Sequence, residues 1–233
     1  MLSSSSTLAD QLKGRVILPA HPDYDEARSV FYGNVDSRPS AIVKVANADD
    51  VARAIAHARE AGLELAVRSG GHSVAGHSTT EGGVVVDLTD MKKLEIDPER
   101  RIAWAETGLT AGEYTAAAGR HGLATGFGDT GSVGIGGITL GGGVGFLARK
   151  HGLAIDSLIA ADIVTADREL LRVDAEMCAL AGDRAAAVQP EDGAAPTRAR
   201  GHEPGRPRVG PPFPGAPLPD APRARQRRPP AAA

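Results

Sequence analysis

The stretch Arg68-Ser69-Gly70-Gly71-His72-Ser73 decides how this sequence is interpreted. It directly follows residues 63–67, a short apolar run typical of a strand, and its glycines leave successive main-chain N–H groups free to converge on an anion. A second glycine-rich stretch, residues 131–145, is far longer than a turn requires and carries Val, Ile and Leu between its glycines. We therefore expect it to be packed and to offer a surface to a flat ligand. Glycines that merely permit turns and bulges are the alternative for either stretch taken alone.

The residues before the first stretch predict a strand, a helix and a second strand. Residues 41–45 form a short apolar run, Asn47 is a suitable helix cap, and Gly62 is a suitable helix stop before residues 63–67. We expect the two strands to pair in parallel through a right-handed crossover.

The residues after it predict further strands and one helix. Residues 84–88 read as a buried strand, and two runs flanking the turn at residues 97–100 read as a hairpin. Thr110 and Glu113 form a capping box for a helix that reaches His121. Residues 158–165 and 170–173 add two strands, so the fold class is α+β.

Two common nucleotide-binding signatures are absent from the sequence. It contains no Gly-x-x-x-x-Gly-Lys-Ser/Thr, which disfavours a P-loop kinase or ATPase. The glycines at 141–145 neither follow the first strand of a βαβ unit nor precede an acidic ribose ligand, as a dinucleotide fingerprint should. A standard NAD site is therefore disfavoured as well.

Several motifs in order resemble one family of flavoproteins. The quoted stretch at 68–73 is followed by Val86-Asp87-Leu88-Thr89, by the glycine-rich residues 131–145, and by further motifs at 152–158 and 162–167. Together they resemble the berberine bridge enzyme-like FAD-linked oxidases, which have the vanillyl-alcohol oxidase type, or PCMH-type, FAD-binding domain. The resemblance runs from about residue 38 to about residue 176.

The resemblance implies a fold and a set of domains. We expect an N-terminal segment over residues 1–37, then a PCMH-type FAD-binding domain of two small α/β subdomains over residues 38–176. Family members are roughly twice as long as this chain, so the domain would be incomplete at its C-terminal side. Residues 177–233 would form a disordered tail rich in Pro, Arg and Ala.

The resemblance also implies FAD as the cofactor, covalently bonded to His72, and no metal. The loop at 69–73 would hold the pyrophosphate, residues 134–145 would line the flavin and phosphate channel, and Val164 would meet the adenine through its backbone. The implied cofactor-binding residues are Arg68, Ser69, Gly70, Gly71, His72, Ser73, Thr130, Ser132, Val133, Gly136, Gly137, Thr139, Gly142, Gly143 and Val164. No catalytic residue is implied.

Other notable residues receive structural roles. Some family members attach the flavin a second time through a cysteine, but Thr130 occupies that position here, which leaves only the histidyl bond. His77 and His121 fall outside the motifs and are expected at the surface or in structural roles. Trp104 and Tyr114 are expected in the core.

Charge and composition change near residue 184. Residues 1–183 hold 17 Lys and Arg against 25 Asp and Glu, whereas residues 184–233 hold 9 Arg against 4 acids and almost no Ile, Leu, Val or aromatic residues. An out-of-frame reading of a GC-rich gene is our hypothesis for this tail, and a basic tail that binds nucleic acid or an acidic partner is the rival.

The function expected from these observations is that of an FAD-dependent oxidoreductase taking hydride from a C–OH or C–N substrate. The alternatives are a noncatalytic FAD-binding fragment and an interaction protein using the basic tail. We expect a small-molecule substrate, no membrane partner and no nucleic-acid partner, and a cytoplasmic location in keeping with the one cysteine, Cys178. The substrate and the oligomeric state are left open.

Overall fold

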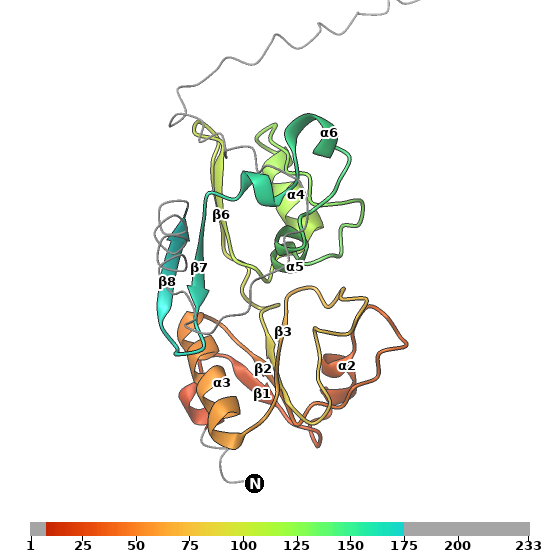
Figure 1. Cartoon of the computed structure of the whole chain (residues 1–233), viewed down its shortest axis with the longest axis vertical. Helices are drawn as coiled ribbons and strands as arrows, with labels where there is room; N and C mark the ends of the chain where they lie inside the picture. The colour runs from red at the N-terminus through yellow and green to blue at the C-terminus, as the bar shows by residue number, and fades with distance from the viewer. Residues whose placement is uncertain (1–7, 175–233) are drawn as a thin grey trace, which may run out of the picture. The chain divides into compact units, whose positions relative to one another are not determined.

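The computed structural model describes residues 8–174 of the protein. Residues 8–11 are helical. The elements that follow are, in chain order, β1 (Arg15–Ile17), α2 (Tyr24–Arg28), β2 (Ala41–Lys44), α3 (Ala48–Ala61), β3 (Leu65–Arg68), β4 (Val84–Asp87), β5 (Leu94–Asp97), β6 (Ile102–Ala105), α4 (Ala111–Gly119), α5 (Ile135–Leu140), α6 (Ala148–His151), the 3-10 helix η1 (Ile155–Ser157), β7 (Ala160–Val164) and β8 (Leu170–Asp174). The arrangement is a mixed α/β fold with small sheets, as expected (Figure 1).

The largest described sheet has four strands in the order β1-β2-β4-β3. β2 and β3 both pair in parallel with β4, and β1 pairs antiparallel with β2. The predicted direct pairing of β2 with β3 was therefore wrong. Val84, Val85 and Val86 are fully buried, and an apolar run of this kind is best buried between two neighbouring strands, so β4 lies between β2 and β3.

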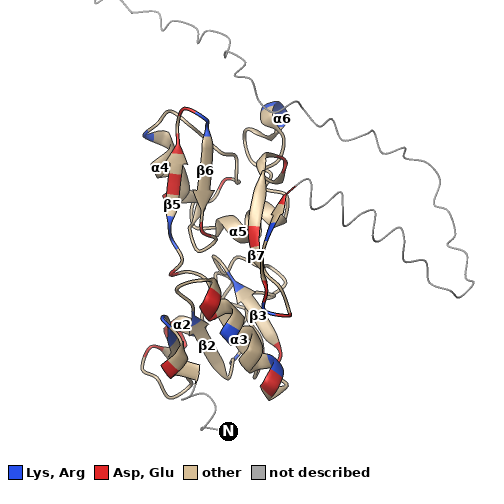
Figure 2. Ribbon diagram, turned by 90° about the vertical axis from the view of Figure 1, so that its left-hand side faces the viewer, with Lys and Arg blue, Asp and Glu red and all other residues tan. Residues whose placement is uncertain are grey.

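Both faces of this sheet are covered. Successive strand residues point to opposite faces, so Val43, Val84 and Val86 pack with Ala54 and Ala58 of α3 in one cluster. Ile42 and Val85 pack on the other face with Ile17 and with Tyr24 of α2. The basic and acidic residues of α3 are visible in Figure 2. β1 and α2, which precede residue 38, thus share the sheet and core of the residues that follow.

The predicted local signals are confirmed by the structure. The Asn47 side chain accepts a hydrogen bond from Asp50 N, and Gly62 ends α3 in the left-handed conformation. Thr110 and Glu113 form the capping box of α4, although this helix ends at Gly119 and not at His121. The hairpins β5–β6 and β7–β8 both form.

The second glycine-rich stretch departs from its prediction. It contains a short helix, α5, and its apolar side chains are only partly packed: Ile135 is buried, whereas Leu140 and Val144 are 75% and 70% exposed. The backbone of its second half packs against residues 153–155, where Ala154 N and Ile155 N donate to the carbonyl oxygens of Gly143 and Gly142. The expectation of a packed stretch is therefore confirmed for its backbone and for Ile135, and was wrong for Leu140 and Val144.

No helix among residues 8–174 is long and apolar enough to cross a membrane. Within the same residues, no three His, Cys, Asp or Glu side chains are grouped so that they could hold a metal ion. Our hypotheses about Cys178 and the tail at 177–233 concern positions outside the described residues.

Candidate functional site

The His72 loop, residues 69–73, begins at the C-terminal end of β3, where the parallel strands β2, β4 and β3 end together. Lys44, Asp87 and Arg68 occupy matching register positions on β2, β4 and β3. Ligands of open α/β sheets characteristically bind beyond the carboxyl ends of the strands. The sheet therefore delivers the predicted loop to an edge suited to binding.

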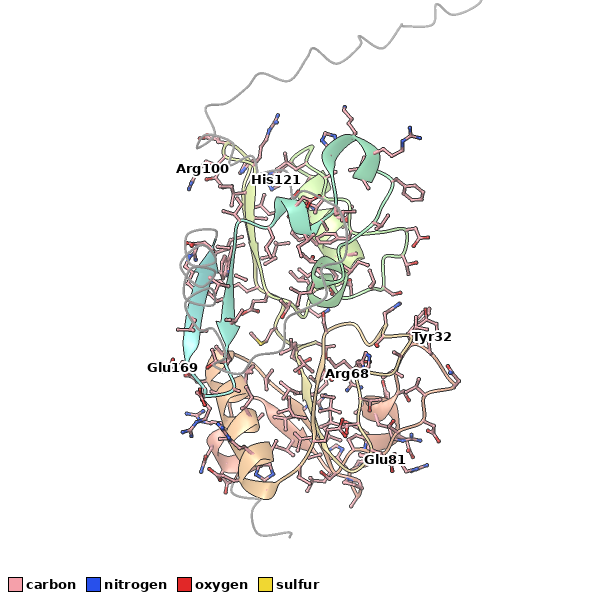
Figure 3. All side chains as sticks on the ribbon, in the orientation of Figure 1. Tyr32, Arg68, Glu81, Arg100, His121 and Glu169 are labelled. Atoms are coloured by element: carbon pink, nitrogen blue, oxygen red, sulfur yellow. The ribbon has the colours of Figure 1, made fainter. Side chains whose placement is uncertain are left out.

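Arg68 turns its guanidinium into the protein and anchors the loop. Its Nη2 donates to Asp87 Oδ2 at 2.8 Å and to the carbonyl oxygen of Ala27 at 2.6 Å. Both side chains of the ion pair are about 5% exposed or less, and Figure 3 shows Arg68 beside α2. Burial would raise the pKa of Asp87, but Arg68, Thr89 and Lys44 together hold this pKa below its ordinary value.

The two glycine-rich stretches meet backbone to backbone. A Cβ atom at Gly70 would overlap the main-chain nitrogen of Gly134, and one at Gly134 would overlap Gly70 in return. Ser69 Oγ also donates to the carbonyl oxygen of Thr107. The contact requires glycine at both positions, because any side chain would force the two segments apart.

The start of α4 holds the second stretch in this place. Ala111 N donates to Val133 O at 2.8 Å, and Ile135 N donates to Leu109 O at 2.9 Å. These two bonds flank the close approach of Gly134 to Gly70. Long-range contacts thus assemble the site from segments far apart in the sequence.

The main-chain N–H groups of residues 69–73 donate to no acceptor within the described part of the chain. Such groups are strong donors that proteins normally pair. Gly71 has a φ of +70°, a conformation that side chains disfavour and that helps successive N–H groups to converge. This loop has the donors that a pyrophosphate requires, so the residues present fit the phosphate part of FAD.

The imidazole of His72 is held on its face and on its edge. The Phe31 ring stacks on it with 4.0 Å between ring centroids and 20° between planes. Burial lowers the pKa of His72 below its ordinary value of 6.5, and a hydrogen bond with the Ser132 backbone opposes this shift. A hydrogen bond that raises a histidine pKa stabilises the protonated ring. In such a bond the imidazole N–H donates and the Ser132 carbonyl oxygen accepts.

A cavity of about 440 Å³ borders this loop. Its lining includes six of the fifteen predicted residues, namely Arg68, Ser69, Gly70, Gly71, His72 and Ser132. Its volume lies within the range of ordinary small-molecule sites. Five predicted residues of the first stretch and Ser132 of the second are therefore brought together at one cavity.

The other predicted residues do not line this cavity. Ser73 accepts a hydrogen bond from His77 N through its Oγ, and the Thr130 hydroxyl bonds to Asp129. Val164 is the last residue of β7, which belongs to a different sheet from the strand that leads into the His72 loop. The rest belong to the second stretch or its helix: Val133, Gly136, Gly137, Thr139, Gly142 and Gly143.

The four residues assigned structural roles behave largely as expected. His77 and His121 are exposed, and Figure 3 shows His121 beside α4. Tyr114 packs against the buried Phe127 in an edge-on contact, 4.9 Å between centroids. Trp104 is only partly buried, and the Arg172 guanidinium lies 5.4 Å from its ring centroid.

Sequence reasoning assigned no role at the site to three contributors to this region, although Asp87 stands in one of the family motifs. Phe31 stacks on His72, and Lys44 and Asp87 complete the charged row beneath the loop. Lys44 and Asp87 each end an apolar run that predicts a strand, a signal that could have placed them at the carboxyl edge. No comparable signal existed for Phe31.

Comparison with known proteins relates most of the described chain to one group. A family model described as "FAD binding domain" matches residues 39–174. The uncharacterised FAD-linked oxidoreductase YvdP of Bacillus subtilis (strain 168) is 42% identical over 165 residues, which are 70% of this chain and 37% of that protein.

Solved structures of oxidases have the same fold as this chain over most of its length. The 6-hydroxy-D-nicotine oxidase of Arthrobacter nicotinovorans matches with a TM-score of 0.70 and 37% identity, covering 71% of this chain and 36% of that one. Glucooligosaccharide oxidase from Acremonium strictum, described with a 6-S-cysteinyl, 8α-N1-histidyl FAD, matches with a TM-score of 0.71 and 28% identity, covering 75% and 37%. This chain thus spans little more than a third of the length of such relatives.

Proposed function

Because the chain belongs to the FAD binding domain family, whose relatives include berberine bridge enzyme-like proteins and hydroxynicotine oxidase, we propose that it binds FAD through the His72 loop and bonds to it through His72. The resemblance predicted from the sequence is confirmed by the family match. The proposal concerns which residues hold the cofactor and what reaction it serves.

One observation carries the proposal: the two glycine-rich stretches join at Gly70 and Gly134 beside His72. This contact places a row of N–H groups that have no acceptor among residues 8–174 next to an imidazole that lines a cavity. Main-chain donors of this kind suit a pyrophosphate, and the imidazole suits attachment of the ring system. The loop would hold the phosphates and His72 the isoalloxazine.

His72 has the properties that attachment requires. Its lowered pKa keeps the ring neutral near pH 7, and the Ser132 carbonyl oxygen takes one N–H, so the other nitrogen keeps its lone pair. That nitrogen would bond to the 8α-methyl carbon of the flavin. This bond would release one proton from the methyl carbon and one from the imidazole, and dioxygen would take up these two protons and the two electrons of the oxidation to give hydrogen peroxide.

The bound flavin would accept hydride from a carbon bearing a hydroxyl or amine group. We propose a small molecule as the substrate and the cytoplasm as the location of the reaction. The general base and the substrate contacts are not assigned to residues of this chain, since the chain spans about 37% of the length of the relatives it matches.

Denaturing gel electrophoresis with in-gel flavin fluorescence tests the attachment. The wild-type chain is expected to give a fluorescent band, and His72→Ala is expected to lose it while still binding FAD non-covalently. His77→Ala is the matched control, since His77 is exposed on the same loop region and lies in no motif. A band that survives in His72→Ala would contradict the proposed bond.

A second candidate is FAD binding without turnover by this chain. It is supported by the many exposed apolar side chains between residues 140 and 159 and by the partial coverage of relatives. This second candidate would be favoured if no alcohol, sugar or amine added to the flavin-loaded protein reduced the bound flavin. The basic-tail alternative concerns residues outside the described part and is tested by salt-dependent binding that deletion of 184–233 abolishes.

A further inference from the structure

Phe31 precedes the residues matched by the family, yet its ring lies against the proposed attachment residue. The Phe31 and His72 rings are nearly parallel, with centroids 4.0 Å apart. Phe31 also makes an edge-on contact with Tyr32, 5.1 Å between centroids. The family match begins only at residue 39.

The segment that carries Phe31 is fastened to the His72 loop by hydrogen bonds. Phe31 N donates to Gly71 O at 3.1 Å, and the Arg68 guanidinium donates to the carbonyl oxygens of Ala27 and Ser29. Arg68 is in turn held by buried Asp87. Residues 27–31 are therefore tied to both ends of the stretch that leads into His72.

A stacked ring restrains an imidazole without covering its nitrogens. The lone pair and the N–H of imidazole lie in the ring plane, whereas Phe31 contacts the face. The last torsion of a histidine side chain is otherwise broad, so an unrestrained ring would sample several orientations. The stack limits that rotation and leaves the edge of the ring, where both nitrogens lie, uncovered by Phe31.

We propose that Phe31 is a positioning residue for flavin attachment, holding His72 by ring stacking so that one in-plane nitrogen is presented to the flavin. The inference rests on the proposed function, because it assumes that His72 is the residue that becomes bonded. It extends the attachment site to an N-terminal segment that the family match does not include.

The environment of His72 makes the pH dependence of attachment informative. The charged side chains that share its cavity are Arg15, Asp23, Glu26, Lys44, Arg68 and Asp87. None of them contributes to the lowering of the His72 pKa, which comes from burial. Removing the Phe31 ring exposes the imidazole, so the pKa rises toward 6.5 and the pH needed for attachment rises with it.

The test measures the rate at which the full chain, prepared without flavin, incorporates added FAD covalently at several pH values. Phe31→Leu keeps an apolar side chain but removes the aromatic face, and Phe31→Tyr keeps that face. At saturating FAD and pH 6 to 7 we expect Phe31→Leu to be roughly threefold to tenfold slower, the scale of one aromatic contact. Its pH profile moves to higher pH, whereas Phe31→Tyr stays close to wild type.

Leu170→Ala is the matched control, because Leu170 and Phe31 are equally exposed, at 57%, and Leu170 lies on β8. It is expected to leave the rate and the profile unchanged. Equal rates and profiles for Phe31→Leu and wild type would overturn the proposal. So would a Phe31→Tyr variant as slow as Phe31→Leu.

A titration of His72 by NMR in the flavin-free chain separates this inference from the proposed function. The His72 signal is identified by its loss in His72→Gln, and its midpoint is expected to rise in Phe31→Leu but not in Phe31→Tyr. If wild type forms no covalent flavin, the proposed function fails and the inference fails with it as a statement about attachment. If wild type does form it and the midpoint is the same in all variants, only the role of Phe31 is overturned.

Discussion

At the scale of single residues, Asp87 is the residue around which the binding edge is organised. Its Oδ2 accepts from Arg68 at 2.8 Å and lies 3.8 Å from Lys44 Nζ, and its Oδ1 accepts from the Thr89 backbone and hydroxyl. The carboxylate is almost fully buried, so these partners replace water. Arg68 therefore serves first as a support of the loop, whatever its later part in holding a cofactor.

Substituting Asp87 is expected to destabilise the protein strongly. Asp87→Asn leaves the Arg68 guanidinium buried without a counter-charge, which costs about 3–5 kcal/mol of unfolding free energy. Urea denaturation at pH 7 measures the loss. The control is Asp90→Asn, since Asp90 is half exposed and its bond to Lys44 is expected to contribute less than about 1 kcal/mol. Equal losses for the two variants would contradict the assignment.

The same residue makes stability depend on acid pH. The pKa of Asp87 in the folded protein is below its ordinary value of 3.8, so the carboxylate contributes stability above pH 3.8. This contribution is lost as the pH falls below 3.8 and through the folded-state pKa. Denaturation measured between pH 5 and pH 3 is expected to show a shallower decline for Asp87→Asn than for wild type. Parallel declines would show that other carboxylates govern acid sensitivity.

At the scale of elements, the start of α3 joins the N-terminal segment to the sheet. The fully buried carboxylate of Asp50 accepts hydrogen bonds from the main-chain N–H groups of Lys13, Gly14 and Ala46, at 2.9–3.0 Å. One side chain thus serves the chain before β1 and the turn between β2 and α3. The element boundary is fixed by this clamp as well as by the Asn47 cap.

Removing the clamp is expected to loosen the N-terminal segment. Asp50→Ala leaves three N–H groups without their acceptor and is expected to cost about 3 kcal/mol, measured by chemical denaturation. Asp49→Ala is the control, because Asp49 is exposed in the same helical turn and has the same favourable charge toward the helix N-terminus. Its loss is expected to be below about 1 kcal/mol. A similar cost for both variants would show that charge, and not the clamp, matters.

The contact between the two glycine-rich stretches is a second element-scale feature. Gly134→Ala places a methyl group against Gly70 N and the Ser69 hydroxyl, so the stretches must separate. We expect about 1–3 kcal/mol of destabilisation and a large loss of FAD binding, measured by denaturation and by flavin fluorescence. Gly119→Ala is the control, since its Cβ meets nothing within 4 Å and Gly119 lies in helical α4. Unchanged FAD binding in Gly134→Ala would contradict the proposed site.

At the scale of the whole molecule, apolar exposure is concentrated in one stretch. Between residues 140 and 159 the exposed large apolar side chains are Leu140, Val144, Phe146, Leu147, Ile155, Leu158 and Ile159. Phe146 is 89% exposed and Ile159 is 64% exposed. Exposed apolar side chains gathered in this way favour association, whereas isolated ones are ordinary.

Reducing this exposure is expected to reduce self-association. The double variant Phe146→Ser and Ile159→Thr should lower the fraction of associated protein in sedimentation velocity experiments at increasing concentration. Val74→Thr is the control, because Val74 is 72% exposed but lies outside this stretch. Association that persists unchanged in the double variant would show that another surface is responsible.

Local structure and family were readable from the sequence, because both depend on residues close together in the chain. Asn47, Gly62, Thr110 and Glu113 each act within one helical turn, so the ends of α3 and the start of α4 followed from residue type. The motifs at 68–73, 86–89, 131–145, 152–158 and 162–167 together indicated the family and its cofactor, each through residues that are close together in the chain. Apolar runs located the strands, although not their neighbours.

Only the tertiary structure decided the contacts between distant segments. It placed β4 between β2 and β3, set Gly70 against Gly134, and laid Phe31 on His72. Each of these depends on the path of the whole chain, which no spacing within a short window encodes. The sequence by itself determined the local helix and strand signals and the family motifs of this protein. The packing of the sheet and its loops determined which residues touch, because contacts between distant residues form only once the core has brought their backbones together.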